Sequence, residues 1–230
     1  MKRSDILFIV VFAGLFLPFI LSHKLYEFFF WFSTEWAFTA SFIKFAILAT
    51  LGEMLGSRIR KGVYLPAGFG LIPRALVWGF LGVTVKAAFM IFSGGVPLIA
   101  SHLGMENTVA VMAGPVTAPK LLLAFSISFF LNIFYAPVLM VTHRVSDLHI
   151  AAAAGDKRKL LKAPDVTSLL ASIDWNSMWG IILKKSIPFF WIPAHTVTFL
   201  LPPQFQVLFA ALLSTMLGVI LALAAGTNRQ

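Results

Sequence analysis

The side chains of this sequence that could perform chemistry lie within or directly beside long apolar stretches. Glu53 is the clearest case, because an ionisable group inside such a stretch is costly unless it has a partner or a function. His143 and Asp147 stand four residues apart, with His149 nearby, a spacing that could ligate a metal ion from one helix. No second acidic cluster accompanies them, so we expect a hydrogen-bonded pair here, and no catalytic residue, metal or cofactor.

Glu53 admits two interpretations that the sequence leaves open. It is a carboxylate that lines a solute pathway, or a buried anchor that accepts hydrogen bonds beside a basic loop. Lys44 lies nine residues earlier, and a rotation of about 100° per residue carries it to the opposite face of a helix. The two side chains therefore cannot pair within one helix, and a single straight pore would not be lined by both. Each is retained as a candidate pathway residue.

Two later stretches carry polar side chains at helical spacing. The first has Ser128, Asn132 and Tyr135 on one face, where we expect mainly hydrogen bonds between helices. The face of the second carries Lys184, Pro188, Trp191, His195 and Thr198. This second stripe fits either a solvated channel or hydrogen bonding between helices. The candidate pathway residues in these stretches are Asn132, Lys184, Lys185, Trp191 and His195.

Two prolines interrupt the second polar stretch. Pro188 and Pro193 each remove a backbone donor, so we expect the helix to kink and to leave carbonyl groups free.

Composition indicates which solvent surrounds these stretches. Of the 230 residues, 59% are hydrophobic and 12% are charged, whereas a soluble domain has about 25% charged residues. This excludes an ordinary water-soluble globule and an intrinsically disordered chain. The net charge of +9 is concentrated between the apolar stretches, which indicates membrane lipids and not nucleic acid as the partner. The absence of cysteine excludes disulfides and thiolate metal sites.

Six apolar stretches are candidates to cross a bilayer, whose hydrocarbon core of about 30 Å needs about 20 helical residues. They are residues 6–22, 36–56, 72–92, 119–141, 178–199 and 204–225. Open strands would leave backbone groups unpaired in lipid, so the spans must be helical. We therefore predict an all-α fold, a polytopic helical membrane bundle of about six transmembrane helices. Residues 1–230 form a single integral membrane domain.

Lys and Arg residues predict the orientation of the bundle. Twelve of the 18 lie on one side of the six spans or at that edge of a span, two (Lys24 and Lys120) lie on the other side or at its edge, and four lie deeper inside spans. The positive-inside rule then places both termini and the long loop 144–177 on the inner side. In a bacterium this is the cytoplasmic (inner) membrane, and in a eukaryote it is an organellar membrane.

Small residues predict where helices approach one another. Gly52 and Gly56 are four residues apart in one span, and Gly79 and Gly82 share a face of the next. Such pairs allow close contact between helix backbones. We expect these four glycines to be packing sites, and a homo-oligomer is left open.

Several residues of the last third of the chain form a recognisable pattern. They are Asp174, Trp175, Trp179, residues 185–195, Pro203, Gln204, Phe205 and residues 212–214. This pattern resembles the signature of the Mpv17/PMP22 membrane protein family, and Gly52 with Glu53 resembles that family's Gly-Asp element. The resemblance implies a four-helix core, to which this chain adds an N-terminal helix. It also implies channel behaviour and passage of small metabolites. Two positions at which this family has polar residues are occupied here by Lys185 and Pro188. The solute selectivity that those polar residues set is therefore not carried over to this chain.

Three functions remain open. The first is an Mpv17/PMP22-like channel or passive transporter for an unidentified small solute. The second is a non-conducting membrane scaffold whose inner loop binds a partner. The third is an intramembrane lipid-modifying enzyme that uses His143 and Asp147, and since we expect no catalytic residue it has the least support.

Overall fold

The computed structural model describes residues 2–227, and the side chains of residues 2–216. Every regular element in this part of the chain is helical. Four helices there are long and apolar enough to cross a membrane: α1 (Arg3–Leu21), α3 (Ala37–Lys61), α4 (Leu71–His102) and a continuous helix from Ala118 to Ala153. These helices agree with an integral membrane protein.

The helix from Ala118 to Ala153 changes type in its middle. It comprises α6 (Ala118–Phe130), the π-helix η1 (Leu131–Tyr135) and α7 (Ala136–Ala153). Pro137, in the first turn of α7, has no N–H group to close an α-helical hydrogen bond. A π-turn just before such a residue widens the helix locally, and π-turns are frequent at functional sites.

Two further helical segments form an antiparallel pair. The π-helix η2 (Met178–Trp191) continues into α11 (Ile192–Leu200), and α12 (Pro203–Thr227) follows after a tight turn. Pro188 lies inside η2 and Pro193 in the first turn of α11. Where the sequence led us to expect a kinked α-helix, the structure therefore has a π-helix that becomes an α-helix just before Pro193.

Shorter helices connect these elements. They are α2 (His23–Glu35), α5 (Thr108–Ala113), α8 (Lys157–Leu161), α9 (Val166–Ala171) and α10 (Trp175–Ser177). Asp165 begins α9 by accepting a hydrogen bond from the backbone N–H of Ser168, as we expect for an N-cap.

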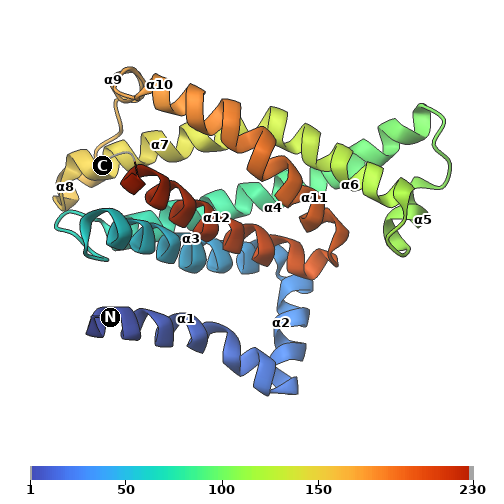
Figure 1. The fold of residues 1–230 in the computed structure, drawn as a ribbon, viewed down its shortest axis with the longest axis horizontal. Helices are drawn as coiled ribbons and strands as arrows, with labels where there is room; N and C mark the ends of the chain where they lie inside the picture. Colours follow the sequence, from blue (N-terminus) through green and yellow to red (C-terminus); the bar gives the residue numbers. More distant parts are fainter. Residues whose placement is uncertain (1, 228–230) are drawn as a thin grey trace.

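The long helices lie side by side in one bundle, with α3 packed against both α4 and α12 (Figure 1). Helix α1 begins and α12 ends at the same end of this bundle as α8, whereas α5 and the turn between α11 and α12 lie at the opposite end. The basic last turn of α3, with Arg58, Arg60 and Lys61, also lies at the end with α8. We call it the basic end of the bundle.

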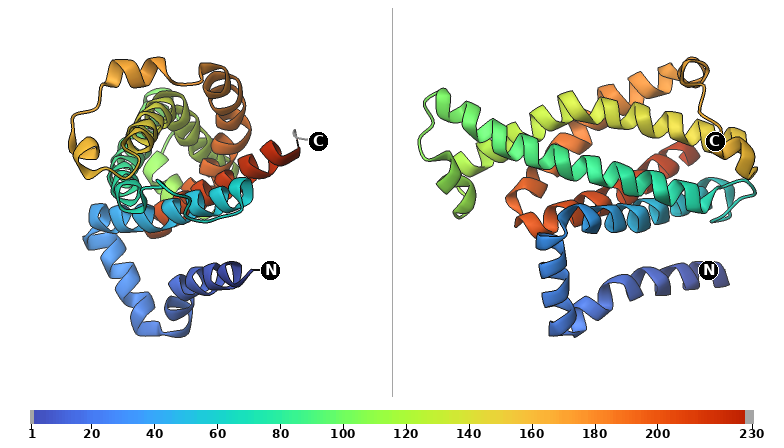
Figure 2. Two further views of the ribbon diagram at one scale, coloured as in Figure 1. Left: turned by 90° about the vertical axis from the view of Figure 1, so that its left-hand side faces the viewer. Right: turned by 180° about the vertical axis from the view of Figure 1, so that it is seen from behind.

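Helix α1 lies along one side of the bundle and is connected to it through α2, which runs across the bundle axis (Figure 2). Phe12, Leu15 and Phe16 of α1 are partly buried against the apolar core of the bundle. No residue of α1 is buried among those described. Its N-terminus is held by Asp5, which accepts hydrogen bonds from Arg58 Nε over 2.7 Å and Nη2 over 2.9 Å. Tyr64 stacks on Phe8 with 4.8 Å between ring centroids, which adds a second attachment.

The helix ends differ most from the predicted spans at two places. Helix α4 continues to His102, ten residues beyond the predicted end at residue 92. Helix α7 continues to Ala153 and so includes the first ten residues of the predicted loop 144–177. Both extensions are helical because they continue an apolar helix without a stop signal until Gly104 and Ala154, which adopt positive φ.

Glycines place α3 in close contact with its two neighbours. A Cβ atom at Gly52 would lie 2.7 Å from Thr215 Cα of α12. A Cβ atom at Gly82 of α4 would lie 2.7 Å from the carbonyl oxygen of Ser41. At Gly79 it would lie 2.5 Å from the ring of Phe42. Larger residues at these positions would force the helices apart.

Replacing Gly82 should therefore weaken the bundle. We expect Gly82→Leu to lower the free energy of unfolding by about 1–3 kcal/mol, because the added side chain meets backbone of α3. Thermal unfolding of the purified protein in detergent measures this as a lower Tm. Gly94→Leu in the same helix is the control, since nothing lies within 4 Å of a Cβ atom there. Equal Tm values for the two variants would contradict the proposed close contact.

Candidate functional site

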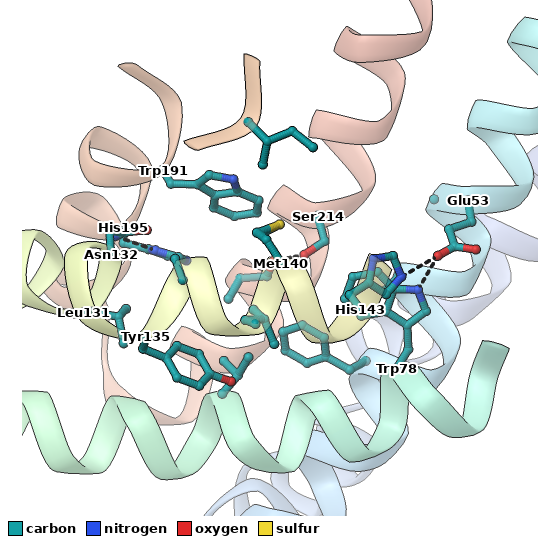
Figure 3. A pocket seen from close by; sticks show the side chains of 18 of the residues that line it. Glu53, Trp78, Leu131, Asn132, Tyr135, Met140, His143, Trp191, His195 and Ser214 are labelled. Atoms are coloured by element: carbon teal, nitrogen blue, oxygen red, sulfur yellow. Dashed lines mark hydrogen bonds and ion pairs between the residues drawn. The ribbon is translucent and has the colours of Figure 1, made fainter. Parts of the chain in front are cut away.

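A cavity of about 220 Å³ lies inside the bundle, among side chains of α3, α4, η1, α7, η2, α11 and α12 (Figure 3). Most of its polar side chains gather at two ends, and Ser214 lies between them. Glu53 and His143 lie at one end, and Asn132, Trp191 and His195 lie at the other. Asn132 and His143 are eleven residues apart on one continuous helix, so the two ends are separated by about 16 Å. Between them the lining is largely apolar and includes Phe45, Ala49, Val85, Leu139 and Met140.

At the first end Glu53 accepts hydrogen bonds at both carboxylate oxygens. Trp78 Nε1 donates to Oε1 over 2.7 Å, and His143 Nε2 lies 2.9 Å from the same oxygen. Arg74 Nη1 donates both to Glu53 Oε2 and to Asp147 Oδ1. We call Glu53, Arg74, Trp78, His143 and Asp147 the Glu53 cluster. It joins α3, α4 and α7 through charged hydrogen bonds.

Helical spacing explains how three helices supply the five residues of the Glu53 cluster. Arg74 and Trp78 lie one turn apart on α4, and His143 and Asp147 lie one turn apart on α7, so each pair projects from one face. The charged side chains of the cluster are only 15% to 19% exposed. At this burial each carboxylate needs a hydrogen-bonded cation, and Arg74 serves both.

The Glu53 cluster also contains a possible donor set for a metal ion. One ligand atom from each of Glu53, His143 and Asp147 can be chosen so that all lie within 4.8 Å of one another. A cation bound there would have to displace Arg74, whose guanidinium group already bonds an oxygen of each carboxylate. The arrangement therefore functions as an ion-pair network that holds helices together.

The second end of the cavity carries no ionic group among the side chains that line it here; we call Asn132, Trp191 and His195 the Asn132 end. Asn132 Nδ2 donates to the carbonyl oxygen of Ser128 over 2.8 Å and lies 3.0 Å from His195 Nδ1. Ser128 Oγ in turn donates to the carbonyl oxygen of Ile192 over 2.7 Å. The ring of Trp191 stacks on His195 with 5.1 Å between centroids. These contacts join the central π-helix η1 to α11 and to the end of η2.

Four of the seven side chains that the sequence identified as pathway candidates line this one cavity. They are Glu53, Asn132, Trp191 and His195. Gly52 and Gly56 line it as well. The structure thus brings together residues from four separate helical segments.

Lys44 does not line the cavity. Its ammonium group donates to Ser33 Oγ over 2.7 Å and lies 4.5 Å from the centroid of the Phe29 ring. Both partners belong to α2, so Lys44 attaches α2 to α3 on the face opposite Glu53. The opposite projection of the two side chains, predicted from helical geometry, explains this placement.

Lys184 and Lys185 also lie outside the cavity, and both are exposed. The predicted stripe that placed Lys184 with Trp191 and His195 assumed α-helical spacing. The segment is a π-helix, in which hydrogen bonds connect residues five apart, so the side chains rotate differently about its axis. This local change of helix type turns Lys184 away from the cavity.

Sequence reasoning missed the partners of Glu53. The sequence assigns Arg74 only to the inner-side charges that fix orientation, whereas in the structure it lies in the first turn of α4 and bonds Glu53. Trp78, one turn later, received no role. His143 and Asp147 were recognised as a pair at helical spacing, which was the available signal, although nothing in the sequence connects them to Glu53.

Comparison with known proteins adds no assignment: no family model, no curated protein and no solved structure matches this chain.

Removing Arg74 should destabilise the bundle more than removing the whole ionic network. We expect Arg74→Met to cost on the order of 3 kcal/mol of unfolding free energy, because Glu53 and Asp147 then lose the guanidinium group that bonds both and keep only His143 beside them. Adding Glu53→Gln and Asp147→Asn should recover part of that loss, since no buried charge remains. Thermal unfolding in detergent gives the comparison, with Arg158→Met in exposed α8 as the control. A triple variant less stable than Arg74→Met would refute this interpretation.

Proposed function

We propose that this protein is a passive membrane transporter for a small solute, which it holds in the cavity between the Glu53 cluster and the Asn132 end. The observation that carries the proposal is the cavity itself, with polar groups at each end and an apolar middle. Ligand sites have this composition, in which apolar walls supply area and a few polar groups orient the ligand.

The dimensions of the cavity favour a small solute that is taken up and released in steps. A cavity of about 150 Å³ already accommodates benzene, and this one has about 220 Å³. Its polar ends are about 16 Å apart, roughly half of a hydrocarbon core of about 30 Å. An open pore would need a continuous path across the whole core.

Packing on either side of the cavity supports the same proposal. Arg60, an exposed side chain at the basic end, belongs to the lining, so the cavity extends toward that end. Beyond Asn132, toward the other end, Leu123, Ala124 and Ile127 are at most 1% exposed. The cavity is thus accessible from the basic end and closely packed beyond Asn132. This is the arrangement expected of a transporter that is open to one side of the membrane.

We also propose that six segments cross the membrane. The η2–α11 segment and α12 would join the four long apolar helices, with both termini and the basic end on the inner side. The gathering of basic residues at the end of the bundle where α1 begins and α12 ends supports this orientation. Membership of the Mpv17/PMP22 family is part of the same proposal and depends on the sequence pattern of the last third.

Filling the cavity should stop transport. We expect Met140→Trp, which places an indole ring in the apolar middle, to reduce solute entry into protein-containing vesicles at least several-fold. Stopped-flow light scattering would follow vesicle swelling with urea, acetamide and glycerol.

The control for this experiment is Leu122→Trp, because Leu122 is 59% exposed on the outer face of α6. Both variants should first show the elution volume and Tm of the wild type. Wild-type vesicles that swell no faster than protein-free vesicles would oppose transport of these solutes. Unchanged swelling with Met140→Trp would oppose the cavity as the route, and a scaffold role would then account better for the bundle.

Single cysteines can test the proposed orientation, because the chain has none of its own. We expect Glu27→Cys in α2 to react with a membrane-impermeant maleimide outside intact cells, and Lys159→Cys in α8 to react only after the cells are opened. Labelling of both positions from the same side would contradict six spans with inner termini.

A further inference from the structure

The Asn132 end contains polar atoms whose hydrogen-bonding capacity the described side chains do not use. Asn132 Oδ1 and Trp191 Nε1 are both buried, and neither has a hydrogen-bond partner among the residues described. Asn132 is 0% exposed and Trp191 is 5% exposed, and both line the cavity. Leaving such groups unpaired costs free energy, which a ligand with matching groups would recover.

The orientation of the Asn132 amide follows from its neighbours. Its Nδ2 faces the carbonyl oxygen of Ser128, which can only accept, so Nδ2 and not Oδ1 must occupy that position. The same Nδ2 donates to His195 Nδ1, and a neutral His195 ring therefore carries its proton on Nε2. No hydrogen bond among the described residues uses His195 Nε2. The Asn132 end thus offers one acceptor, Asn132 Oδ1, and two donors, Trp191 Nε1 and His195 Nε2.

Aromatic rings form the walls around these atoms. Trp191 and His195 stack at an interplanar angle of 29°, and the Phe89 ring meets His195 edge-on at 82°, with 5.7 Å between centroids. The nearest cationic side chain of the lining, Arg60, belongs to the basic end of the bundle, and Lys184 and Lys185 lie outside the cavity. An anion at the Asn132 end would therefore lose its hydration without gaining a cation from the lining described here.

We propose that the Asn132 end is a binding site for a neutral, planar small molecule that carries a carbonyl group together with an N–H group, as a primary amide does. The carbonyl oxygen accepts from Trp191 Nε1 or His195 Nε2, and the N–H group donates to Asn132 Oδ1. The apolar body of the molecule lies along the middle of the cavity, beside Leu139 and Met140. This inference deepens the proposed transport function by naming the class of solute, and it rests on that function for its physiological meaning.

Three probes of nearly the same shape test this proposal on the wild-type protein. Benzamide has both groups, benzoate replaces the N–H group by negative charge, and toluene has neither. Calorimetric titration of the protein in lipid nanodiscs, with empty nanodiscs as background, gives the three affinities. We expect benzamide to bind at least tenfold more tightly than benzoate, and about fivefold or more tighter than toluene, from the hydrogen bonds that it gains.

A variant then identifies the site. Trp191→Phe removes the indole N–H and keeps an aromatic ring, so benzamide should bind about fivefold more weakly while toluene binding stays unchanged. Trp179→Phe is the matched control, because Trp179 lies on the same η2 segment, is 64% exposed and does not line the cavity. Equal affinities for benzamide and toluene, no binding of benzamide, or an equal effect of both Trp variants would overturn the proposal.

The vesicle experiment separates this inference from the transport proposal. Binding of benzamide without any solute entry into vesicles would leave the site in place and refute transport of the solutes tested. Swelling that Met140→Trp abolishes, combined with no benzamide binding, would leave transport in place and refute the amide site.

Discussion

The guanidinium group of Arg74 is the interaction on which the rest of the structure depends. Glu53 and Asp147 come from different helices, and with little water around them neither could stay ionised without a cation. Arg74 bonds both and thereby fixes the separation of α3, α4 and α7 at one end of the cavity. Trp78 of α4 and His143 of α7 complete the hydrogen bonds to Glu53.

The shape of the cavity follows from close packing at some positions and wide spacing at others. Gly52 brings α12 against α3, and Gly82 brings α4 against α3, so these backbones nearly touch. On the other side, the π-helices η1 and η2 supply Asn132 and Trp191. Close packing at the glycines and the ion pairs of Arg74 therefore hold the helices around the cavity. The Asn132 end of this cavity carries neutral polar groups.

Sequence reasoning identified much of this structure because the chain follows simple physical rules. Apolar length predicted the long helices, and the high cost of a buried carboxylate marked Glu53 as significant. The opposite projection of Lys44 was also correct, and the structure shows Lys44 bound to α2. The N-cap of α9 at Asp165 likewise follows from local sequence, because its carboxylate bonds a backbone N–H three residues away.

The remaining features depend on contacts that no local pattern reports. Arg74 is 21 residues from Glu53 and 73 from Asp147, so only the tertiary fold brings them together. Lys184 was misplaced because one π-helical segment invalidates α-helical spacing. The lengths of α4 and α7 were underestimated because the predicted spans were matched to the thickness of a bilayer, and these helices continue beyond it.

The length of the helix from Ala118 to Ala153 has a consequence for how the molecule can be handled. Its 36 residues extend about 54 Å, well beyond a hydrocarbon core of about 30 Å, even with a strong tilt. In the proposed orientation its polar final turns, with Arg144, Ser146 and His149, stand clear of the lipid. They provide a stiff support outside the membrane, and a soluble protein inserted near Gly155 would move with the bundle as one body.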